Sequence, residues 1–160
     1  MHFLEKERKI TIATQNVDGL HGLAGSTNVL ELHGSLQRGR CRECSNVVPI
    51  GEVHELLSKG IEDPLCSKCK NFILPDIVFF GENLAENIAR EAFTEAKEAA
   101  LCLVIGSSLE VSPADILPFD AKEAGKPVII LNEEPTPFDE SATVVLRGKA
   151  EVVLPALVRV

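Results

Sequence analysis

Two Cys-x-x-Cys pairs constrain the fold of this chain more than any other feature of its sequence. Cys41 and Cys44 form the first pair, Cys66 and Cys69 form the second, and 21 residues lie between the two pairs. Each pair can present two thiolates from one tight turn, so two such turns complete the four ligands of a tetrahedral ion. Because all four positions are thiolates and none is left for water, the pattern predicts a structural Zn²⁺ site.

Other uses of the four thiols stay open at this point. A redox dithiol normally occurs once, beside a βαβ unit, and thiolate ligands suit an iron centre as well as zinc. A DNA-reading zinc finger is disfavoured by charge, since residues 35–70 carry six Lys or Arg against five Asp or Glu. The whole chain has a net charge of −8 and a pI near 5. We therefore expect no direct binding to nucleic acid.

Signals for export or membrane insertion are missing from the sequence. No apolar stretch reaches the ~18 residues of a membrane span, and residues 1–10 are charged rather than like a signal peptide. Five cysteines in such a chain favour metal binding or free thiols, because the cytosol keeps thiols reduced. We expect a cytoplasmic protein with no membrane partner, in which the fifth cysteine, Cys102, is a buried core residue.

Short apolar runs and helix-forming stretches alternate outside the thiol region. Alternation of this kind implies a parallel sheet with helices between its strands. The predicted fold class is α/β, a Rossmann-like parallel sheet with a small zinc-ribbon lobe, residues 36–72, inserted in it. The expected strands are residues 9–14, 28–32, 101–105, 127–131 and 143–146, and the expected helices are residues 86–100, 114–124 and 150–160.

Small or polar residues follow the expected strands. Ligands of doubly wound sheets bind beyond the carboxyl ends of the strands, so these residues predict a nucleotide cleft. The simpler explanation is that strands end in loops and that loops are polar, as expected for residues 15–25 with their three glycines. An acid just past a Rossmann-type strand, here Glu133, commonly accepts hydrogen bonds from ribose hydroxyls. The strand-end groups are Gln15-Asn16, Gly106-Ser107-Ser108, Asn132-Glu133 and Arg147-Gly148.

His33 is distinguished from the other histidines by its position. It follows an apolar strand, precedes a glycine, and lies shortly before the thiol region, at the expected seam between two lobes where pockets form. An imidazole exchanges protons near neutral pH, so His33 is a candidate general base, with a structural role as the alternative. His21 could be structural or line the cleft, whereas His2 and His54 have only surface context.

Five segments carry motifs that together match one known family. Thr14 to His21 resembles the TQN(I/V)DxLH signature of the sirtuins, and Glu31 to Ser35 resembles their catalytic-histidine motif. Residues 75–82 are similar to the sirtuin segment that pairs with the substrate peptide, and residues 105–114 are similar to a cofactor-binding turn. Residues 145–150 are similar to the closing motif of bacterial and archaeal members, so the likeness covers nearly the whole chain.

The resemblance implies a reaction. Sirtuins are NAD-dependent deacylases that remove acetyl or other acyl groups from protein lysines and release nicotinamide and O-acetyl-ADP-ribose. In that chemistry the acyl oxygen attacks the ribose carbon that bears nicotinamide, which gives an alkylimidate, and a histidine then acts as general base. The likeness makes His33 that base, NAD the co-substrate, one Zn²⁺ a structural metal, and acylated lysine proteins or peptides the partners.

The resemblance also implies binding roles. The peptide segment would offer backbone hydrogen bonds to an extended substrate, adding it as a strand. For its two adjacent phenylalanines the alternative is core packing of one, since neighbouring strand residues point to opposite faces. The implied cofactor-binding residues are Gln15, Asn16, Val17, Asp18, Gly106, Ser107, Ser108, Asn132, Glu133 and Ala150, and the implied peptide-binding residues are Val78, Phe79, Phe80, Gly81 and Glu82.

The sequence departs from the family pattern at its beginning. Neither the glycine-rich first cofactor motif nor the arginine-bearing loop of the sirtuins occurs, and residues 1–10 resemble the end of the helix that precedes the strand before Gln15. We expect an N-terminally incomplete sheet with an exposed strand edge, without the βα unit whose backbone amides bind pyrophosphate. Residues 1–160 would then be one truncated sirtuin-type catalytic domain, arising from a truncated gene model, an internal start or a genuine remnant.

This departure leaves two alternatives to deacylation. One is an inactive fragment that acts as a zinc-bearing, peptide-binding scaffold. The other is a protein ADP-ribosyltransferase, which cleaves the same cofactor. Residues 79–82 resemble the peptide loop of robust deacetylases, and this resemblance favours deacylation.

Overall fold

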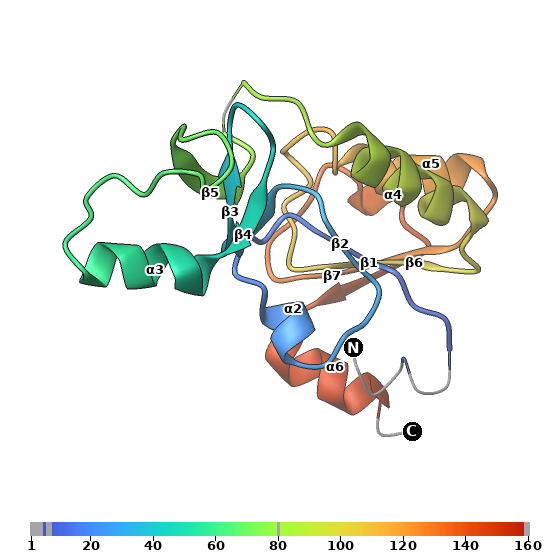
Figure 1. The fold of residues 1–160 in the computed structure, drawn as a ribbon. Coiled ribbons are helices and arrows are strands. Elements are labelled where there is room, and N and C mark those ends of the chain that lie inside the picture. Colours follow the sequence, from blue (N-terminus) through green and yellow to red (C-terminus); the bar gives the residue numbers. More distant parts are fainter. Residues whose placement is uncertain (1–4, 6–7, 80, 159–160) are drawn as a thin grey trace. The chain divides into compact units, whose positions relative to one another are not determined.

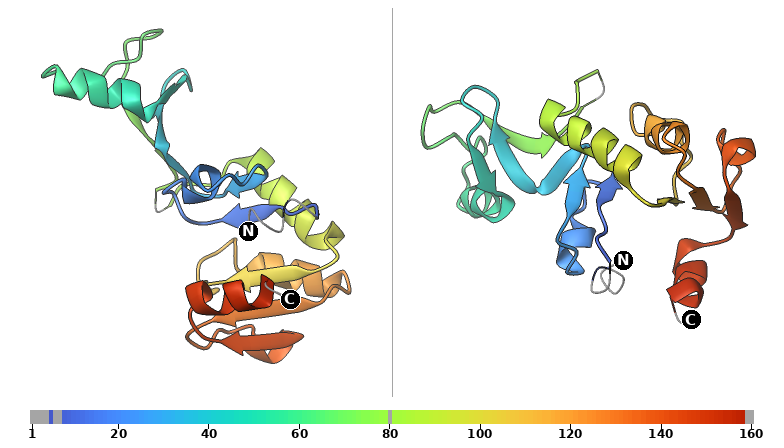
Figure 2. Two further views of the ribbon diagram at one scale, coloured as in Figure 1. Left: turned by 90° about the horizontal axis from the view of Figure 1, so that it is seen from below. Right: turned by 90° about the vertical axis from the view of Figure 1, so that its right-hand side faces the viewer.

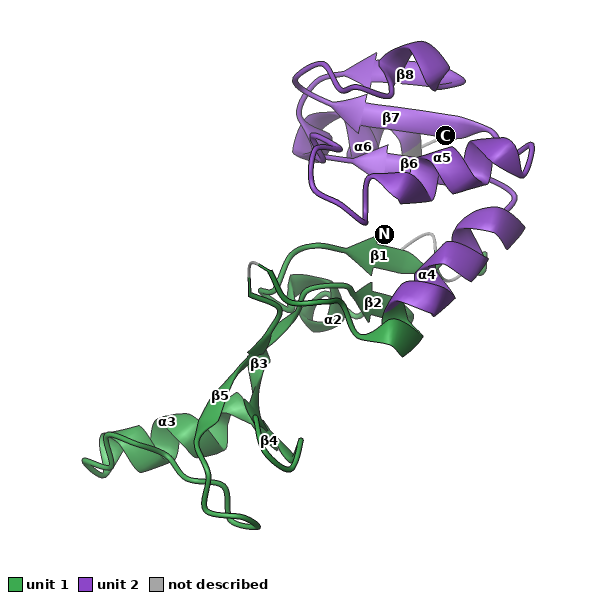
Figure 3. Ribbon diagram, turned by 90° about the horizontal axis from the view of Figure 1, so that it is seen from above, with its two compact units in different colours: residues 1–88 green, residues 89–160 purple. Residues whose placement is uncertain are grey.

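The computed structural model describes residues 5, 8–79 and 81–158, and its chain divides into two compact units, residues 1–88 and 89–160 (Figure 3). Among these residues, no helix combines the length and the apolar character needed to cross a membrane. The elements, in chain order, are β1 (Ile12–Thr14), α2 (Leu20–Leu23), β2 (Val29–Glu31), β3 (Gly34–Cys41), β4 (Val47–Pro49), α3 (Ile50–Ser58), β5 (Ile73–Ile77), α4 (Glu86–Glu98), β6 (Cys102–Ile105), α5 (Ile116–Glu123), β7 (Val128–Asn132), the 3-10 turn η1 (Asp139–Ser141), β8 (Val144–Arg147) and α6 (Ala150–Val158) (Figure 1).

The expected strands and helices are confirmed within the described residues, with ends that differ by a few residues at most, and the α/β fold class is confirmed with them. Residues 159 and 160 of the last expected helix lie outside the described residues. Residues 15–25 were wrongly expected to be loop throughout, because α2 forms one helical turn there. The Oδ1 atom of Asp18 accepts a hydrogen bond from the Leu20 N–H at 2.9 Å, which starts the turn. Gly22 and Gly25 are poor helix formers, and the helix ends at Leu23.

The first unit begins with a parallel strand pair. Strands β1 and β2 pair from Ile12 opposite Val29 to Thr14 opposite Glu31. The Leu32 N–H donates to the Thr14 carbonyl at 2.9 Å and extends this ladder past β2. Because both strands run in the same direction, the residues after Thr14 and after Glu31 leave the pair at the same edge. This edge carries the first predicted cofactor segment and His33.

A second sheet in this unit is antiparallel, with strand order β4-β3-β5. Strand β3 runs from the His33 loop to Cys41 and pairs with β5 through an irregular register between Ser35 and Gly39. Helix α3, which the sequence did not predict, packs on β3 and β4 (Figure 2). A Cβ at Gly39 would collide with Ile73 Cγ2 of β5 and crowd Val53 Cγ2 of α3, so this glycine allows both elements to pack closely on β3. We call this sheet with α3, residues 34–77, the thiol lobe; it encloses the predicted lobe 36–72.

The second unit contains the parallel sheet β6-β7-β8, with α5 and α6 on opposite faces (Figures 2 and 3). Strand β7 is apolar from Val128 to Leu131 because a parallel sheet is covered on both sides. Its Ile130 packs in a core with Val104 and Phe138, and the rings of Phe119 and Phe138 meet edge to face at 4.5 Å. Cys102 is half-buried against this core, and burial raises the pKa of its thiol to about 11.

Candidate functional site

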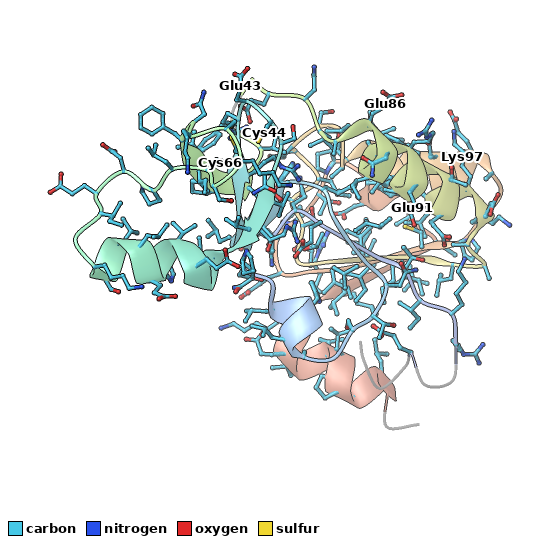
Figure 4. The ribbon with its side chains drawn as sticks, in the orientation of Figure 1. Glu43, Cys44, Cys66, Glu86, Glu91 and Lys97 are labelled. Carbon is cyan, nitrogen blue, oxygen red and sulfur yellow. The ribbon has the colours of Figure 1, made fainter. Side chains whose placement is uncertain are left out.

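The four paired cysteines form one cluster in the thiol lobe. All four Sγ atoms lie within 4.8 Å of one another, with Cys41 to Cys69 at 3.3 Å and Cys44 to Cys66 at 3.6 Å. A tetrahedral Zn²⁺ with Zn–S bonds of about 2.3 Å requires sulfur separations of about 3.8 Å. The cluster therefore fits a structural zinc with only small adjustments. Cys44 and Cys66 are labelled in Figure 4, with the side chain of Glu43 nearby.

The two cysteine turns are built in the same way. In each turn, the carbonyl of the first cysteine accepts a hydrogen bond from the N–H of the residue four positions later. The N–H of the same cysteine donates to the carbonyl of the residue five positions later. The residue four positions later has a left-handed backbone, with φ of 56° at Ser45 and 62° at Lys70. The hydrogen bonds are Ser45 to Cys41 (3.0 Å), Cys41 to Asn46 (2.9 Å), Lys70 to Cys66 (2.9 Å) and Cys66 to Asn71 (2.7 Å).

Backbone amides prepare the two buried thiols for ionisation. The pKa of Cys66 is lowered to about 6, chiefly by a hydrogen bond from the Cys69 N–H. The Lys68 N–H and the neighbouring thiols act in the same direction, whereas burial acts to raise this pKa. The N–H of Cys44 is the largest influence that lowers the pKa of Cys41. For Cys69 the Asn71 N–H acts in the same direction, but the neighbouring sulfurs and burial together raise its pKa to about 12. A bound cation removes that repulsion between thiolates, which is what metal binding at this site supplies.

His33 is held through its main chain at the end of β2. Its carbonyl accepts the Val78 N–H at 3.0 Å, and its neighbour Leu32 is bonded to β1. Gly34 has a φ of +76°, and a Cβ there would lie far inside contact distance of the Asp76 carbonyl oxygen. Only glycine lets the chain pass so close to β5. The His33 side chain is half-buried, so it is both fixed at its base and reachable.

The predicted cofactor residues 15–18 lie at the same edge of the first unit. The Gln37 side chain donates to the Asp18 carbonyl at 3.0 Å, and the Leu36 N–H donates to the Val17 carbonyl at 2.8 Å. The Thr14 hydroxyl accepts the Asn16 N–H at 3.1 Å. The first two bonds tie the segment to β3, directly after His33, and the third ties it to the end of β1. The structure thus brings the predicted amides and carboxylate to the end of the strand pair that also carries His33.

An ion-pair network supports this edge, and its members were not recognised as a group in the sequence. Arg38 contacts Glu31 at 2.7 Å and Asp76 at 3.0 Å, and Arg40 contacts both oxygens of Asp76 at 2.5 and 3.2 Å. Burial acts to raise the pKa of Asp76, but the two guanidinium groups lower it below its ordinary value. The alternation of Arg38 and Arg40 along one strand face was the signal that could have revealed a buried acid opposite.

The predicted peptide segment follows β5. Val78 bonds to His33, and beyond it the Glu82 N–H donates to the Phe79 carbonyl at 2.9 Å, which closes a turn around Gly81 with φ of +87°. Phe79 is 44% exposed, so it is not a core residue. Phe80 lies outside the described residues. Val78, the first residue of the predicted peptide segment, therefore adjoins the candidate base within one unit.

In the second unit, the remaining predicted residues lie at the carboxyl edge of β6-β7-β8, where Ile105, Leu131 and Leu146 are in register. The Gly106 N–H continues the ladder to Leu131 at 2.9 Å, and the Ser107 hydroxyl accepts the Leu109 N–H at 3.3 Å. The predicted residues at this edge are Gly106, Ser107 and Ser108 after β6, Asn132 and Glu133 at β7, and Ala150 at the start of α6.

Arg147, one of the predicted strand-end residues, organises this second edge through contacts that the sequence did not predict. Its side chain donates to the Glu134 carbonyl at 3.0 Å and pairs with Asp139, while the Asn132 side chain donates to the same carbonyl at 2.8 Å. Hydrogen bonds from Thr136 are the largest influence that lowers the pKa of Asp139. Glu133 stays exposed beside this network. An exposed acid with an anchored amide neighbour is suited to accept bonds from sugar hydroxyls.

Known proteins resemble the chain over most of its length. The sequence model of a family described as the Sir2 family matches residues 1–113 of the chain. The NAD-dependent protein deacetylase 1 of Pyrobaculum aerophilum is 44% identical over 146 residues, which are 91% of this chain and 57% of that protein. The NAD-dependent protein deacetylase of Sulfurisphaera tokodaii is 46% identical over 147 residues, 92% of this chain and 58% of that protein. The chain thus spans less than two thirds of the length of these relatives.

Solved structures of Sir2 proteins also match nearly the whole of this chain. A Sir2 protein with a p53 peptide and NAD⁺ matches with a TM-score of 0.88 and 37% identity, over 98% of this chain and 65% of that one. Sir2Tm bound to a propionylated peptide matches with a TM-score of 0.90 and 37% identity, over 99% of this chain and 67% of that one.

Proposed function

The chain belongs to the Sir2 family, and on that premise we propose that it serves in the NAD-dependent removal of acetyl or other acyl groups from protein lysines. One observation carries the proposal: His33 lies at a single edge with residues 15–18 and is hydrogen-bonded to the start of segment 78–82. A proton acceptor, sugar-binding groups and a peptide-binding backbone are the three elements that this reaction needs in one place.

NAD would supply the ADP-ribose that accepts the acyl group when it is bound. The residues of the chain have simpler tasks. His33 would take the proton of a ribose hydroxyl, and Gln15, Asn16, Val17 and Asp18 would orient the nicotinamide ribose. The adenosine part would be held by the residues at the edge of the second unit, which are Gly106, Ser107, Ser108, Asn132, Glu133 and Ala150.

An extended peptide with an acylated lysine would be the partner of residues 78–82. The segment follows an antiparallel strand and is exposed at Phe79, Gly81 and Glu82, so an extended peptide can reach it. Structures of relatives hold acetylated and propionylated peptides, which supports this class of substrate. The four thiolates would bind Zn²⁺ as a structural ion, and its task would be to hold the thiol lobe from which β3 and β5 lead to His33.

The remaining expectations become part of the proposal. Residues 1–160 would act as one sirtuin-type catalytic domain with the zinc lobe, residues 36–72, inserted in it. The cytoplasm would be its location, because four reduced thiols are needed for the metal site. Relatives named deacetylases and deacylases favour neither the scaffold nor the ADP-ribosyltransferase alternative.

Release of nicotinamide from NAD in the presence of an acetyl-lysine peptide tests the proposal. The zinc-loaded chain is compared with His33→Ala and with His54→Ala, which removes an exposed histidine on α3. Because nicotinamide leaves before His33 acts, the informative quantity is release beyond the first equivalent per chain. We expect this turnover to fall at least about 100-fold in the first variant and to persist in the second. Peptide-dependent turnover that survives in His33→Ala, or no release from a folded, zinc-loaded chain, would contradict the proposal.

A further inference from the structure

Arg42 connects the metal-binding turn to the peptide segment. It stands between Cys41 and Cys44, and its guanidinium carbon lies 5.3 Å from the centre of the Phe79 ring. Its Nη1 atom lies 3.4 Å from Oε1 of Glu82. A side chain that starts at a metal ligand turn therefore contacts two residues of the segment 78–82.

Glu82, which pairs with Arg42, also forms hydrogen bonds with the backbone of the segment. Its Oε2 atom accepts the Phe79 N–H at 3.0 Å, and its own N–H donates to the Phe79 carbonyl at 2.9 Å. One carboxylate oxygen thus holds the turn and the other pairs with Arg42. Gly81, with φ of +87°, permits the tight turn but adds no stiffness of its own.

Among the described residues of the segment, no core contact accounts for the placement of these two side chains. The Phe79 side chain has no place in a core, and both charged groups are partly exposed, 36% for Arg42 and 43% for Glu82. An exposed pair contributes little by itself, because its ends remain mobile. Here the Arg42 backbone is fixed by the cysteine turn, so the ordering cost is shared with the metal site.

We infer that Arg42 is a positioning residue that orders segment 78–82 for the substrate peptide from the metal-binding turn. The inference rests on the proposed function of that segment. Arg42 does not contact the reacting atoms, so its effect falls on peptide binding and not on the chemical step. A structural metal bound at the cysteines would then also help to order the peptide segment, since loosening the first cysteine turn would release Arg42 from Phe79 and Glu82.

The test compares the zinc-loaded full chain with Arg42→Ala, Arg42→Lys and Lys68→Ala. Lys68 is an exposed cation in the second cysteine turn, so its removal is a matched control for charge and location. We expect Arg42→Ala to raise the KM for an acetyl-lysine peptide about fivefold, the size of one exposed ion pair with one cation–π contact. The kcat and the KM for NAD should stay within about twofold, because the chemical groups are untouched. Arg42→Lys keeps the charge but not the planar stack, so it should restore part of the affinity.

Amide hydrogen exchange at Phe79 and Glu82 supplies a readout that needs no turnover. Exchange at both amides should accelerate in Arg42→Ala and stay unchanged in Lys68→Ala, with equal zinc content in all variants. Unchanged exchange and KM in Arg42→Ala, or loss of zinc from that variant, would overturn the inference. If the parent chain releases no nicotinamide while Arg42→Ala alone accelerates exchange, the proposed function fails and the ordering by Arg42 stands.

Discussion

The thiol lobe and the second unit are stabilised by different means. The largest fully buried side chains of the second unit are apolar, Phe138, Ile130, Leu131, Val128 and Pro118, whereas those of the thiol lobe are Cys41, Cys66 and Ser35. One region thus has a hydrophobic core, and the other has metal ligands where a core would be. A small lobe that buries little apolar surface needs such a replacement for the hydrophobic effect. We therefore expect the thiol lobe, which begins directly after His33, to depend for its stability on a metal ion that a chelator can remove.

Removal of the metal should produce the largest difference between the two regions. Zn²⁺ binding at structural thiolate sites contributes on the order of 10 kcal/mol, far more than any other interaction available to the thiol lobe. A strong chelator should abolish amide protection in β3, β5 and α3 and leave that of β6, β7 and β8 in place. Hydrogen exchange followed by mass spectrometry distinguishes the two sheets. Persistent protection of β3 in the zinc-free chain would show that the lobe does not need its metal.

Two isoleucine-to-alanine substitutions, one in each region, compare the hydrophobic core of the second unit with the thiol lobe. Ile130→Ala in the core of the second unit should cost about 3 kcal/mol of unfolding free energy, because it leaves a cavity in a fully buried place. Ile61→Ala in the thiol lobe should cost less than about 0.5 kcal/mol, since Ile61 is 43% exposed. Denaturant unfolding, with exchange in β7 as a local measure, gives both values. Equal costs at the two positions would remove the distinction between a core and a metal-held lobe.

The Asp76 network should give an intermediate effect. Asp76→Asn removes the charge that two arginines share in a side chain only 12% exposed, so we expect a loss of about 1–2 kcal/mol. Asp63→Asn, an exposed acid of the same lobe, is the matched control and should be neutral within about 0.5 kcal/mol. Exchange at β5 amides and the melting temperature report the change.

The pH dependence of this effect has a definite sign. The pKa of Asp76 is lowered in the folded chain, so its contribution is complete above the unfolded carboxyl pKa of about 3.9 and is lost as the pH falls through the lower folded value. The stability difference between the parent chain and Asp76→Asn should therefore be constant from pH 7 to about pH 4 and shrink below it. A difference that vanished already between pH 7 and pH 5 would mean that another group titrates there.

Local sequence signals predicted the parallel strands, the helices α4, α5 and α6, and the clustering of the four cysteines, and for a physical reason. Strand β7 is apolar from Val128 to Leu131 and α4 has helical periodicity, so each follows from a short window of sequence. The cysteine spacing likewise encodes two turns that need no distant partner. The Asp76 network could not be predicted in this way, because Glu31 and Asp76 meet Arg38 only after β3 pairs with β5. The contact of Arg42 with Phe79 also joins residues far apart in sequence, and the roles of His33 and of residues 15–18 came from the family resemblance.

Exposed ion pairs should give the smallest effects and show which charges of the thiol lobe matter. Lys59 and Glu55 approach to 2.5 Å but are 60% and 65% exposed, so Lys59→Ala should cost about 0.3 kcal/mol. Lys97 pairs with a less exposed partner, Asp120, at 3.2 Å between α4 and α5, and Lys97→Ala should cost slightly more, about 0.5 kcal/mol. Unfolding at low and at 1 M salt measures both, and the losses should disappear at high salt. If Lys59→Ala cost as much as Asp76→Asn, charge alone would support the lobe. If it costs little, the shared and shielded position of Asp76 is what makes its pairs matter.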